Sequence, residues 1–422
     1  MSAGGPVEEF RRIQKQHARC VWLDGGGARA WSRRRSILGW LEDDDVSLAY
    51  DATRGEVTRH AGGRSAVVGD DPFVVLEEEL ATGSPSDQWF GYFGYAARPG
   101  LPARADPELP DAVWMRPSHI RAFEHDEYSE REPARHGALP APAHRTDATA
   151  YRQAFARVQE HLHAGNSYEV NLTHRIRAAS DLDPATAYLR LRELNPAPYA
   201  GFLQHDVNGA RAWLLSSSPE RYALVTADRT LETRPIKGTT PRGTTPEDDE
   251  AARHRLATDP KFRSENLMIV DLLRNELAMV CDVGSVVVPT LMEVESYASV
   301  HQLVSTVRGR LRDDVTTLAA LRSLFPAGSM TGAPKLRTME IVDEVEATPR
   351  GAYSGAFGWV AGDGRADLGV IIRSLVTTDP DGGYLIGTGG GITVDSRADE
   401  ELAETEWKTA RLLRALDPGA LG

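Results

Sequence analysis

Apolar and polar positions recur with clear periods mainly in the last two thirds of this 422-residue chain. Residues 147–166 and 259–280 carry apolar side chains at intervals of three and four, which predicts amphipathic helices. The first of these segments ends in a Gly-Asn pair, which is a helix stop signal. Further helices are predicted over residues 187–195, 316–325, 333–346 and 398–416.

Strand patterns lie between these helices. Residues 167–179 alternate like a strand, and residues 210–238 contain two or three hairpin strands separated by the turn signals "SPE" and "ADR". Further strands are predicted over residues 285–294, 301–311, 351–360 and 367–376, and a turn over residues 387–396. Because the strands come in runs and are interleaved with helices, the pattern favours an α+β fold over regular βαβ units.

The N-terminal third is patterned more weakly, and only residues 22–42 and 87–100 predict short strands and turns. Residues 129–148, "SEREPARHGALPAPAHRTDA", are rich in proline, alanine and charge, which predicts a flexible surface loop or linker. We therefore expect three regions: residues 1–128, the loop 129–148, and the strongly patterned residues 149–417.

Composition narrows the class of protein. The formal net charge is −13, which argues against a general nucleic-acid binder because phosphate binding requires a basic surface. Cys20 and Cys281 are the only cysteines, too few for a disulfide framework or a multi-cysteine zinc site. The N-terminus has no apolar signal core and no apolar run reaches about 18 residues, so we expect a soluble, cytoplasmic protein without a membrane span.

Acidic residues on two predicted helices are the first candidates for chemistry. Glu265 shares a helix face with Met268, Ile269 and Leu272. It is either a charge near the helix N-terminus, favoured by the helix dipole, or a buried carboxylate with a partner.

Glu401 and Glu404 lie three positions apart on the last helix and therefore on one side of it. A solvated acidic face is the ordinary interpretation. If both converged with Glu265, the three carboxylates would offer the oxygen ligands that Mg²⁺ prefers.

Other candidates lie in turns and strands. Arg373 stands in the apolar segment "GVIIRSL" and, if buried, requires an anion. Glu220 in "SSSPERY" follows a proline between two strands, and is either a surface acid or a general acid. The glycine-rich segments 327–332 and 387–392 lack a phosphate-binding fingerprint, although flexible backbone can aim several N–H groups at an anion.

Lys237 lies in the proline-stiffened segment "TRPIKGTTPRG", with Arg234 before it and Arg242 after it. Neighbouring cations would depress the pKa of this lysine and make its amine a nucleophile. The sequence alone leaves open whether Lys237 is a reacting group or an ordinary solvent-exposed lysine.

Nine ordered motifs resemble the chorismate-utilising enzyme family, and within it the aminodeoxychorismate synthase component I group. They are "SPERY", "TRPIKGT", "ENLMIVDLLRNEL", "VHQLVSTVRG", "FPAGSMTGAPK", "GAYSGAFGW", "IIRSL", "GTGGGI" and "AETEWK". The resemblance covers about residues 150–417, so residues 149–417 would be the chorismate-binding catalytic region and residues 1–128 an N-terminal portion of the same fold. It implies two stacked antiparallel β-sheets with helices outside and the active site between them.

The resemblance also implies roles for individual residues. Lys237 would be the nucleophile and Glu220 the general acid. Glu265, Glu404 and Glu401 would hold Mg²⁺, which grips the ring carboxylate of chorismate. The remaining substrate-binding positions would be Arg373, Ser329, Thr331, Gly389, Gly390, Thr239 and His301.

A lysine in "PIKGT" is typical of the enzymes that place ammonia on carbon 4 of chorismate, whereas anthranilate synthases carry alanine there. Retention at carbon 4 can come from two inversions: lysine adds at carbon 2 and expels the hydroxyl, and ammonia then replaces lysine. Ammonia would come from glutamine through a separate glutamine amidotransferase subunit.

Alternatives remain open at this stage. The chain could form anthranilate or 2-amino-2-deoxyisochorismate, or be a non-catalytic paralogue that binds chorismate. Gln302, with His301 before it, occupies the place of a histidine that assists pyruvate loss in anthranilate synthases, which weakens that alternative. Glu169 stands where isochorismate synthases have a lysine base and many ammonia-using synthases a glutamine.

Overall fold

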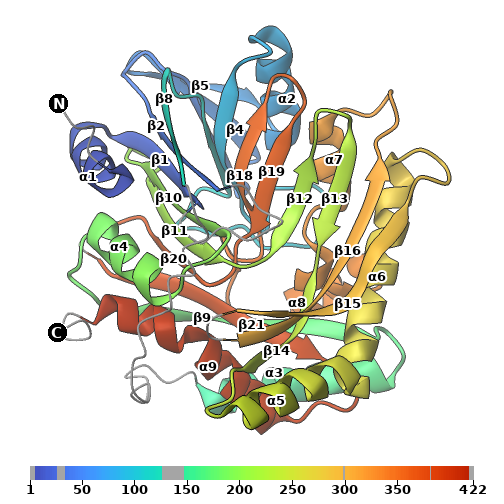
Figure 1. The fold of residues 1–422 in the computed structure, drawn as a ribbon. Coiled ribbons are helices and arrows are strands. Elements are labelled where there is room, and N and C mark those ends of the chain that lie inside the picture. Colours follow the sequence, from blue (N-terminus) through green and yellow to red (C-terminus); the bar gives the residue numbers. More distant parts are fainter. Residues whose placement is uncertain (1–4, 26–33, 126–146, 298–299, 381, 418–422) are drawn as a thin grey trace.

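The structure is a computed structural model that describes residues 5–25, 34–125, 147–297, 300–380 and 382–417. Its strands form two large antiparallel sheets that face each other, with most helices on the outer sides (Figure 1). This confirms the predicted α+β fold of two stacked sheets.

The first sheet has nine strands. Their spatial order is β17 (Gly332–Ala333), β9 (Glu169–Ala178), β21 (Tyr384–Ile392), β20 (Ser374–Thr377), β11 (Ala212–Ser218), β10 (Tyr199–His205), β1 (Arg19–Asp24), β2 (Arg35–Trp40) and β8 (His119–Glu124). Strand β21 pairs with β9 along its whole length, from Tyr384 opposite Ala178 to Ile392 opposite Val170.

The second sheet has twelve strands. Their order is β14 (Ile236–Pro241), β16 (Val300–Arg310), β13 (Thr230–Arg234), β12 (Arg221–Val225), β19 (Ala366–Val370), β18 (Ala356–Ala361), β6 (Gln88–Phe93), β7 (Ala112–Met115), β3 (Ser47–Asp51), β4 (Glu56–Ala61) and β5 (Arg64–Gly69), with β15 (Val287–Ser296) paired to β16.

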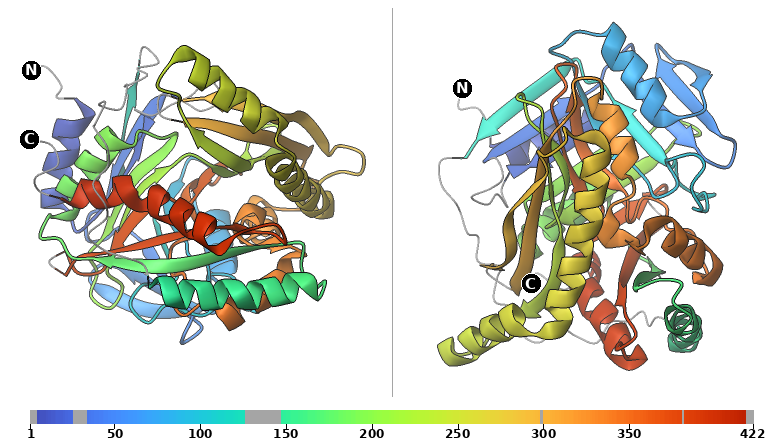
Figure 2. Two further views of the ribbon diagram at one scale, coloured as in Figure 1. Left: turned by 90° about the horizontal axis from the view of Figure 1, so that it is seen from below. Right: turned by 90° about the vertical axis from the view of Figure 1, so that its right-hand side faces the viewer.

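The helices of the described segments are α1 (Pro6–Gln16), α2 (Pro72–Thr82), α3 (Ala148–His163), α4 (Pro184–Leu194), α5 (Pro246–Thr258), α6 (Pro260–Val280), α7 (Thr317–Leu324), α8 (Lys335–Val345) and α9 (Ala398–Leu416). Helix α9 packs on β21 and α4, α3 packs on β9, and α6 runs beside β16 (Figure 2). Where the chain is described, no helix has the length and apolarity needed to cross a membrane.

Apolar side chains between the two sheets hold them together. One buried cluster joins Leu203 and Leu214 of the nine-stranded sheet to Phe90 and Phe357 of the other sheet. A second cluster packs α1, α4 and α9 on the outside of the nine-stranded sheet, and a third packs α2, α6 and α7 on the twelve-stranded sheet. Both sheets are therefore buried on two faces over much of their area.

The N-terminal residues contribute strands to both sheets. β1 pairs with β10, and β6 pairs with β18, so strands from the first 128 residues lie beside strands from the C-terminal region. Of the predicted loop 129–148, residues 129–146 lie outside the described part of the chain.

Three local predictions are wrong. Residues 351–355 form turns, and the strand begins only at Ala356. The segment 367–376 is two strands in different sheets, β19 and β20. "GTGGGI" is not a turn but part of β21, because its backbone pairs with β9.

Three helices had no prediction. They are α1 and α2 in the weakly patterned N-terminal region, and α5. By contrast α6 begins at Pro260 behind the Asp259 cap, so Glu265 lies in its second turn rather than among its first residues.

Candidate active site

A cleft of about 1010 Å³, including its open mouth, lies where the edges of the two sheets meet. Its walls come from β14, α6, β21 and α9, from the turn before β12 and from the short 3-10 turn Gly328–Met330. The predicted site residues that line it are Glu220, Lys237, Thr239, Glu265, Ser329, Arg373, Gly389, Gly390, Glu401 and Glu404. Residues scattered over 185 positions of sequence are thus gathered in one place, counting from 220 to 404 inclusive.

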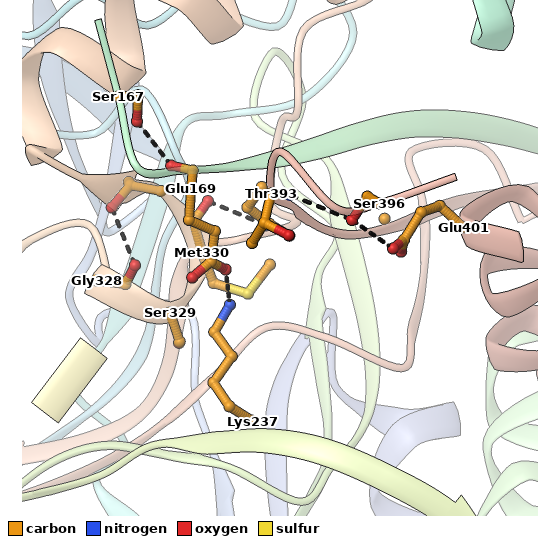
Figure 3. Close-up of polar contacts among 12 residues, drawn as sticks. Ser167, Glu169, Lys237, Gly328, Ser329, Met330, Thr393, Ser396 and Glu401 are labelled. Atoms are coloured by element: carbon orange, nitrogen blue, oxygen red, sulfur yellow. Dashed lines mark hydrogen bonds and ion pairs between the residues drawn. The ribbon is translucent and has the colours of Figure 1, made fainter. Parts of the chain in front are cut away.

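Lys237 points from β14 toward the first residue of β9. Its Nζ donates a hydrogen bond to Oε1 of Glu169 in a buried ion pair (Figure 3). Lys237 is 8% exposed and Glu169 is fully buried. A Cβ at Gly391 would overlap Glu169 Oε1 and lie 3.2 Å from Lys237 Nζ, so only glycine leaves room there for this pair.

The charges around Lys237 differ from the prediction. Arg234 is paired with Glu295 and Arg242 with Asp249, so neither cation is directed at the lysine. Burial lowers the pKa of Lys237, but the charges of Glu169 and Glu265 outweigh it and the net pKa is raised. The expected depression by neighbouring arginines is therefore wrong, because carboxylates rather than cations surround the amine.

Glu220 lies in the turn between β11 and β12 and is 4% exposed. Burial raises the pKa of its carboxyl to about 7, although a hydrogen bond from Ser329 and the charge of Lys237 lower it. The Ser329 hydroxyl donates to Glu220 Oε1 at 2.6 Å. A carboxyl that is partly protonated near neutral pH is suited to deliver a proton.

Arg373 lies between β19 and β20, where the chain passes from one sheet to the other. Its φ of 52° is in the left-handed region, which a non-glycine residue seldom adopts, and this turns the side chain into the cleft. The guanidinium carbon lies 5.5 Å from the centre of the Trp407 ring. Burial and then Arg411 lower its pKa to about 10, so the arginine remains cationic and can bind an anion.

Three carboxylates face the cleft from two helices. Glu401 accepts from Lys261 Nζ at 3.1 Å and from Ser396 at 2.7 Å, and Glu404 pairs with Lys408 at 2.7 Å.

Glu265 on α6 differs from these two. Its Oε1 is buried and has no hydrogen-bond partner among the described residues. Burial raises its pKa to about 7 despite the opposing charge of Lys237. A buried carboxylate oxygen without a hydrogen-bond donor is the arrangement expected of a group that coordinates a cation.

The three carboxylates are not yet gathered like the ligands of one ion. In the described segments no three acidic, histidine or cysteine side chains form such a group. Nevertheless a Cβ at Gly390 would lie 3.3 Å from Glu401 Oε2 and 4.0 Å from Glu404 Oε1, so both carboxylates border the same stretch of β21. Their oxygen chemistry fits a hard cation such as Mg²⁺.

Two predicted residues do not line the cleft. Thr331 is fully buried and donates to the carbonyl of Gly328, so it holds the 3-10 turn in shape. His301 bonds to Ser296 and Asp249. Its neighbour Gln302 lines the cleft instead, since successive side chains of a strand point to opposite faces.

Sequence reasoning missed several residues of the cleft. Lys261, Lys408, Asn171 and Tyr353 all line it. Lys408 was detectable, because it lies four positions after Glu404 on α9, a spacing that pairs opposite charges. No comparable signal marks Asn171 or Tyr353.

Known proteins are similar to this chain in sequence and in fold. The family described as chorismate binding enzyme matches residues 43–414. An aminodeoxychorismate synthase of Streptomyces pristinaespiralis is 43% identical over 98% of this chain, which spans 66% of that relative's length. Aminodeoxychorismate synthase component 1 of Klebsiella aerogenes is 36% identical over 86% of this chain and 87% of its own length. The crystal structure of anthranilate synthase component I from Streptococcus pneumoniae TIGR4 matches with a TM-score of 0.74 and 25% identity over 97% of each chain.

Proposed function

This chain belongs to the family of chorismate binding enzymes, and on that premise we propose that it aminates chorismate at carbon 4, as an aminodeoxychorismate synthase component 1. The product would be 4-amino-4-deoxychorismate. The observation that carries this proposal is a buried lysine, Lys237, in a cleft that also holds an acid poised near neutrality and a buried arginine.

The proposed reaction has two displacements. The Lys237 amine forms a bond to ring carbon 2, the ring double bonds shift, and the bond between carbon 4 and its hydroxyl oxygen breaks. Glu220 supplies the proton with which the hydroxyl leaves as water. Ammonia then bonds to carbon 4, the double bonds shift back, and the bond between carbon 2 and the lysine nitrogen breaks. The ammonium formed at carbon 4 gives a proton back to Glu220, which restores the acid. Two inversions give net retention.

Substrate binding is assigned to groups around the lysine. Arg373 would hold the carboxylate of the enolpyruvyl side chain through its guanidinium fork, with backbone groups near Gly389 and Gly390 beside it. Ser329 and Thr239 complete the wall. His301 would act only indirectly, by holding Asp249, which also receives the Arg242 guanidinium.

A divalent cation fits the acidic side of the cleft. Glu265, Glu401 and Glu404 would hold Mg²⁺, and the unpartnered buried oxygen of Glu265 supports this. When bound, Mg²⁺ would neutralise the ring carboxylate of chorismate and fix its position. Lys261 and Lys408 would give up part of their pairing with Glu401 and Glu404.

Ammonia would come from a separate glutaminase subunit. Cys20 and Cys281 are both buried, and burial raises the pKa of the Cys281 thiol to about 11. Neither is therefore suited to be the nucleophile of glutamine hydrolysis. Ammonium at high concentration should replace the partner in an assay.

A product assay tests the proposal. The protein is incubated with chorismate, Mg²⁺ and ammonium, and the products are identified by mass spectrometry. We expect aminodeoxychorismate from the unaltered chain and none from Lys237→Ala. Lys237→Arg serves as the matched variant, since it keeps a cation beside Glu169 without a comparably nucleophilic amine, and should be equally inactive. Anthranilate and pyruvate from the unaltered chain and Lys237→Ala alike would refute the proposal.

A further inference from the structure

We propose that Glu169 is the proton acceptor that converts the Lys237 ammonium into the nucleophilic amine, an inference that rests on the proposed function. A primary ammonium has no lone pair with which to attack carbon, so the lysine must lose a proton before each turnover. The structure offers a carboxylate in contact with the nitrogen that has to be deprotonated.

The position of Glu169 is rigidly defined. It is the first residue of β9 and lies opposite Ala333 of β17, while the next residues of β9, Val170 and Asn171, pair with Ile392 and Gly391 of β21. Hydrogen-bonded strands on both sides therefore aim its side chain at Lys237. Its second oxygen, Oε2, is buried and has no hydrogen-bond partner among the described residues.

The other carboxylates near Lys237 have different positions. Glu220 and Glu265 face the amine from the turn before β12 and from α6, and their charges act on it. The hydrogen bond of Nζ in the described structure nevertheless goes to Glu169. Glu220 must keep a proton to act as the acid, and Glu265 is directed at the proposed cation. Glu169 is therefore the carboxylate left to receive the proton.

The proton transfer balances with the rest of the reaction. One proton moves from Lys237 Nζ to Glu169 Oε1, giving a neutral amine and a neutral acid without changing the net charge of the buried pair. Exclusion of water by bound chorismate favours this neutral pair, because buried charges are costly. When ammonia displaces the lysine from carbon 2, the amine is released neutral and Glu169 returns the proton. The resting ion pair is restored.

The test follows the first displacement alone. The protein is mixed with chorismate and Mg²⁺ without ammonia, quenched in acid, and examined by intact-protein mass spectrometry for an adduct of chorismate minus one water. We expect Glu169→Gln to form this adduct about 100-fold more slowly or worse, the usual effect of losing a general base. Glu169→Asp keeps a carboxylate and should recover part of the rate.

A pH series separates proton transfer from a merely structural role. In Glu169→Gln the lysine can lose its proton only to solvent, so the variant should form the adduct faster as the pH rises. The rate of adduct formation in the unaltered protein, divided by the rate in the variant, should therefore fall between about pH 7 and pH 9. Because Glu220 is present in both proteins, its titration affects both rates alike and cancels in their ratio. A constant ratio would mean that Glu169 only shapes the cleft, and would overturn the inference.

A matched variant controls for the loss of a buried carboxylate. Glu276 pairs with the buried amine of Lys335, and neither residue lines the cleft. Glu276→Gln should leave the adduct rate unchanged, although it lowers the melting temperature. If Glu169→Gln does not fold, the comparison of Glu169→Asp with the unaltered chain decides, since an unslowed aspartate variant would contradict a base at this position.

The outcomes distinguish the two proposals. No adduct in the unaltered protein refutes the lysine route, and this inference with it. An adduct that forms in Glu169→Gln as fast as in the unaltered protein, or faster, overturns the inference and leaves the lysine route standing. Faster formation would show that Glu169 restrains the lysine as an ion pair instead of activating it.

Discussion

The loss of activity at high pH should follow the deprotonation of the Glu220 carboxyl. Burial raises the pKa of its carboxyl above the usual range of a glutamate, to about 7. A general acid works only while protonated, so kcat/KM for chorismate should fall about tenfold per pH unit well above pH 7. Activity is therefore lost as pH rises, the opposite of the dependence produced by a general base.

Ser329→Ala should shift this loss of activity along the pH scale in a defined direction. The Ser329 hydroxyl donates to Glu220 Oε1 at 2.6 Å and stabilises the carboxylate, which lowers the pKa. Removing it favours the protonated acid, so the alkaline limb should move to higher pH. A hydrogen bond to a charged group contributes about 1.5 to 3 kcal/mol, and about 1.4 kcal/mol corresponds to one pKa unit. Because water can replace part of the lost bond, we expect a shift of about one unit.

The assay is the pH dependence of kcat/KM for the unaltered chain, Ser329→Ala and Glu220→Gln. Free ammonia is held constant by adjusting total ammonium at each pH. Glu220→Gln should be slower by about 100-fold or more and lack the alkaline limb. If its residual activity keeps the limb, or if Ser329→Ala moves the limb to lower pH, then the titrating group is not Glu220.

Three further predictions concern the rest of the cleft. Gly391→Ala should reduce adduct formation by about 100-fold, because its methyl group would displace Glu169 and crowd Lys237, and adduct formation at the unaltered rate would refute this. Arg373→Lys keeps the charge but loses the guanidinium fork, so the KM for chorismate should rise by about tenfold or more with a smaller change in kcat, as steady-state kinetics would reveal. Chelation of divalent cations with EDTA should abolish chorismate turnover, and added Mg²⁺ should restore it. Calorimetry should show weaker Mg²⁺ binding in Glu265→Gln than in the unaltered chain. Full activity in EDTA would contradict the proposed cation site.

The elements that sequence predicted best are those with a strong apolar period. Helix α6 buries a stripe of residues against the twelve-stranded sheet, so its pattern is visible in the chain. Helix α5 shows the opposite case, since only Ala252 and Leu256 are buried and the remaining residues are largely polar. It starts at the Thr245 cap with acidic residues in its first turn, and these end signals give little information about periodicity.

The strand predictions failed where the chain changes sheets. "DLGVIIRSLV" is a continuous apolar segment, yet β19 ends at Val370 in one sheet and β20 begins at Ser374 in the other. Both sheets are buried on two faces, so the side chains before and after the crossing are equally apolar. The left-handed conformation of Arg373 marks the crossing, and an arginine does not signal positive φ in sequence.

The electrostatics of Lys237 could not be predicted from its neighbours in the chain. Arg234 and Arg242 are near in sequence, but Glu295 and Asp249 neutralise them. The residue that does contact the amine, Glu169, is 68 positions away. It reaches the amine because β9, the second strand of one sheet, lies close to β14, the edge strand of the other. Charge effects act over a few ångströms of space, so sequence distance is a poor guide to them.

The two glutamates that flank Lys237 differ in their neighbours, and this difference separates their roles. Glu220 meets a hydroxyl at 2.6 Å and buried surroundings, which hold its carboxyl near the midpoint of its titration at neutral pH. Glu169 forms an ion pair with the Lys237 ammonium, and this contact is the geometry on which its proposed role as proton acceptor rests. One fold can thus supply an acid and a base of the same residue type, because the nearest partner and the burial decide which one holds the proton. If substitutions gave Glu220 the ammonium neighbour and Glu169 the hydroxyl neighbour, both displacements should therefore be lost, even though every carboxylate remained in the cleft.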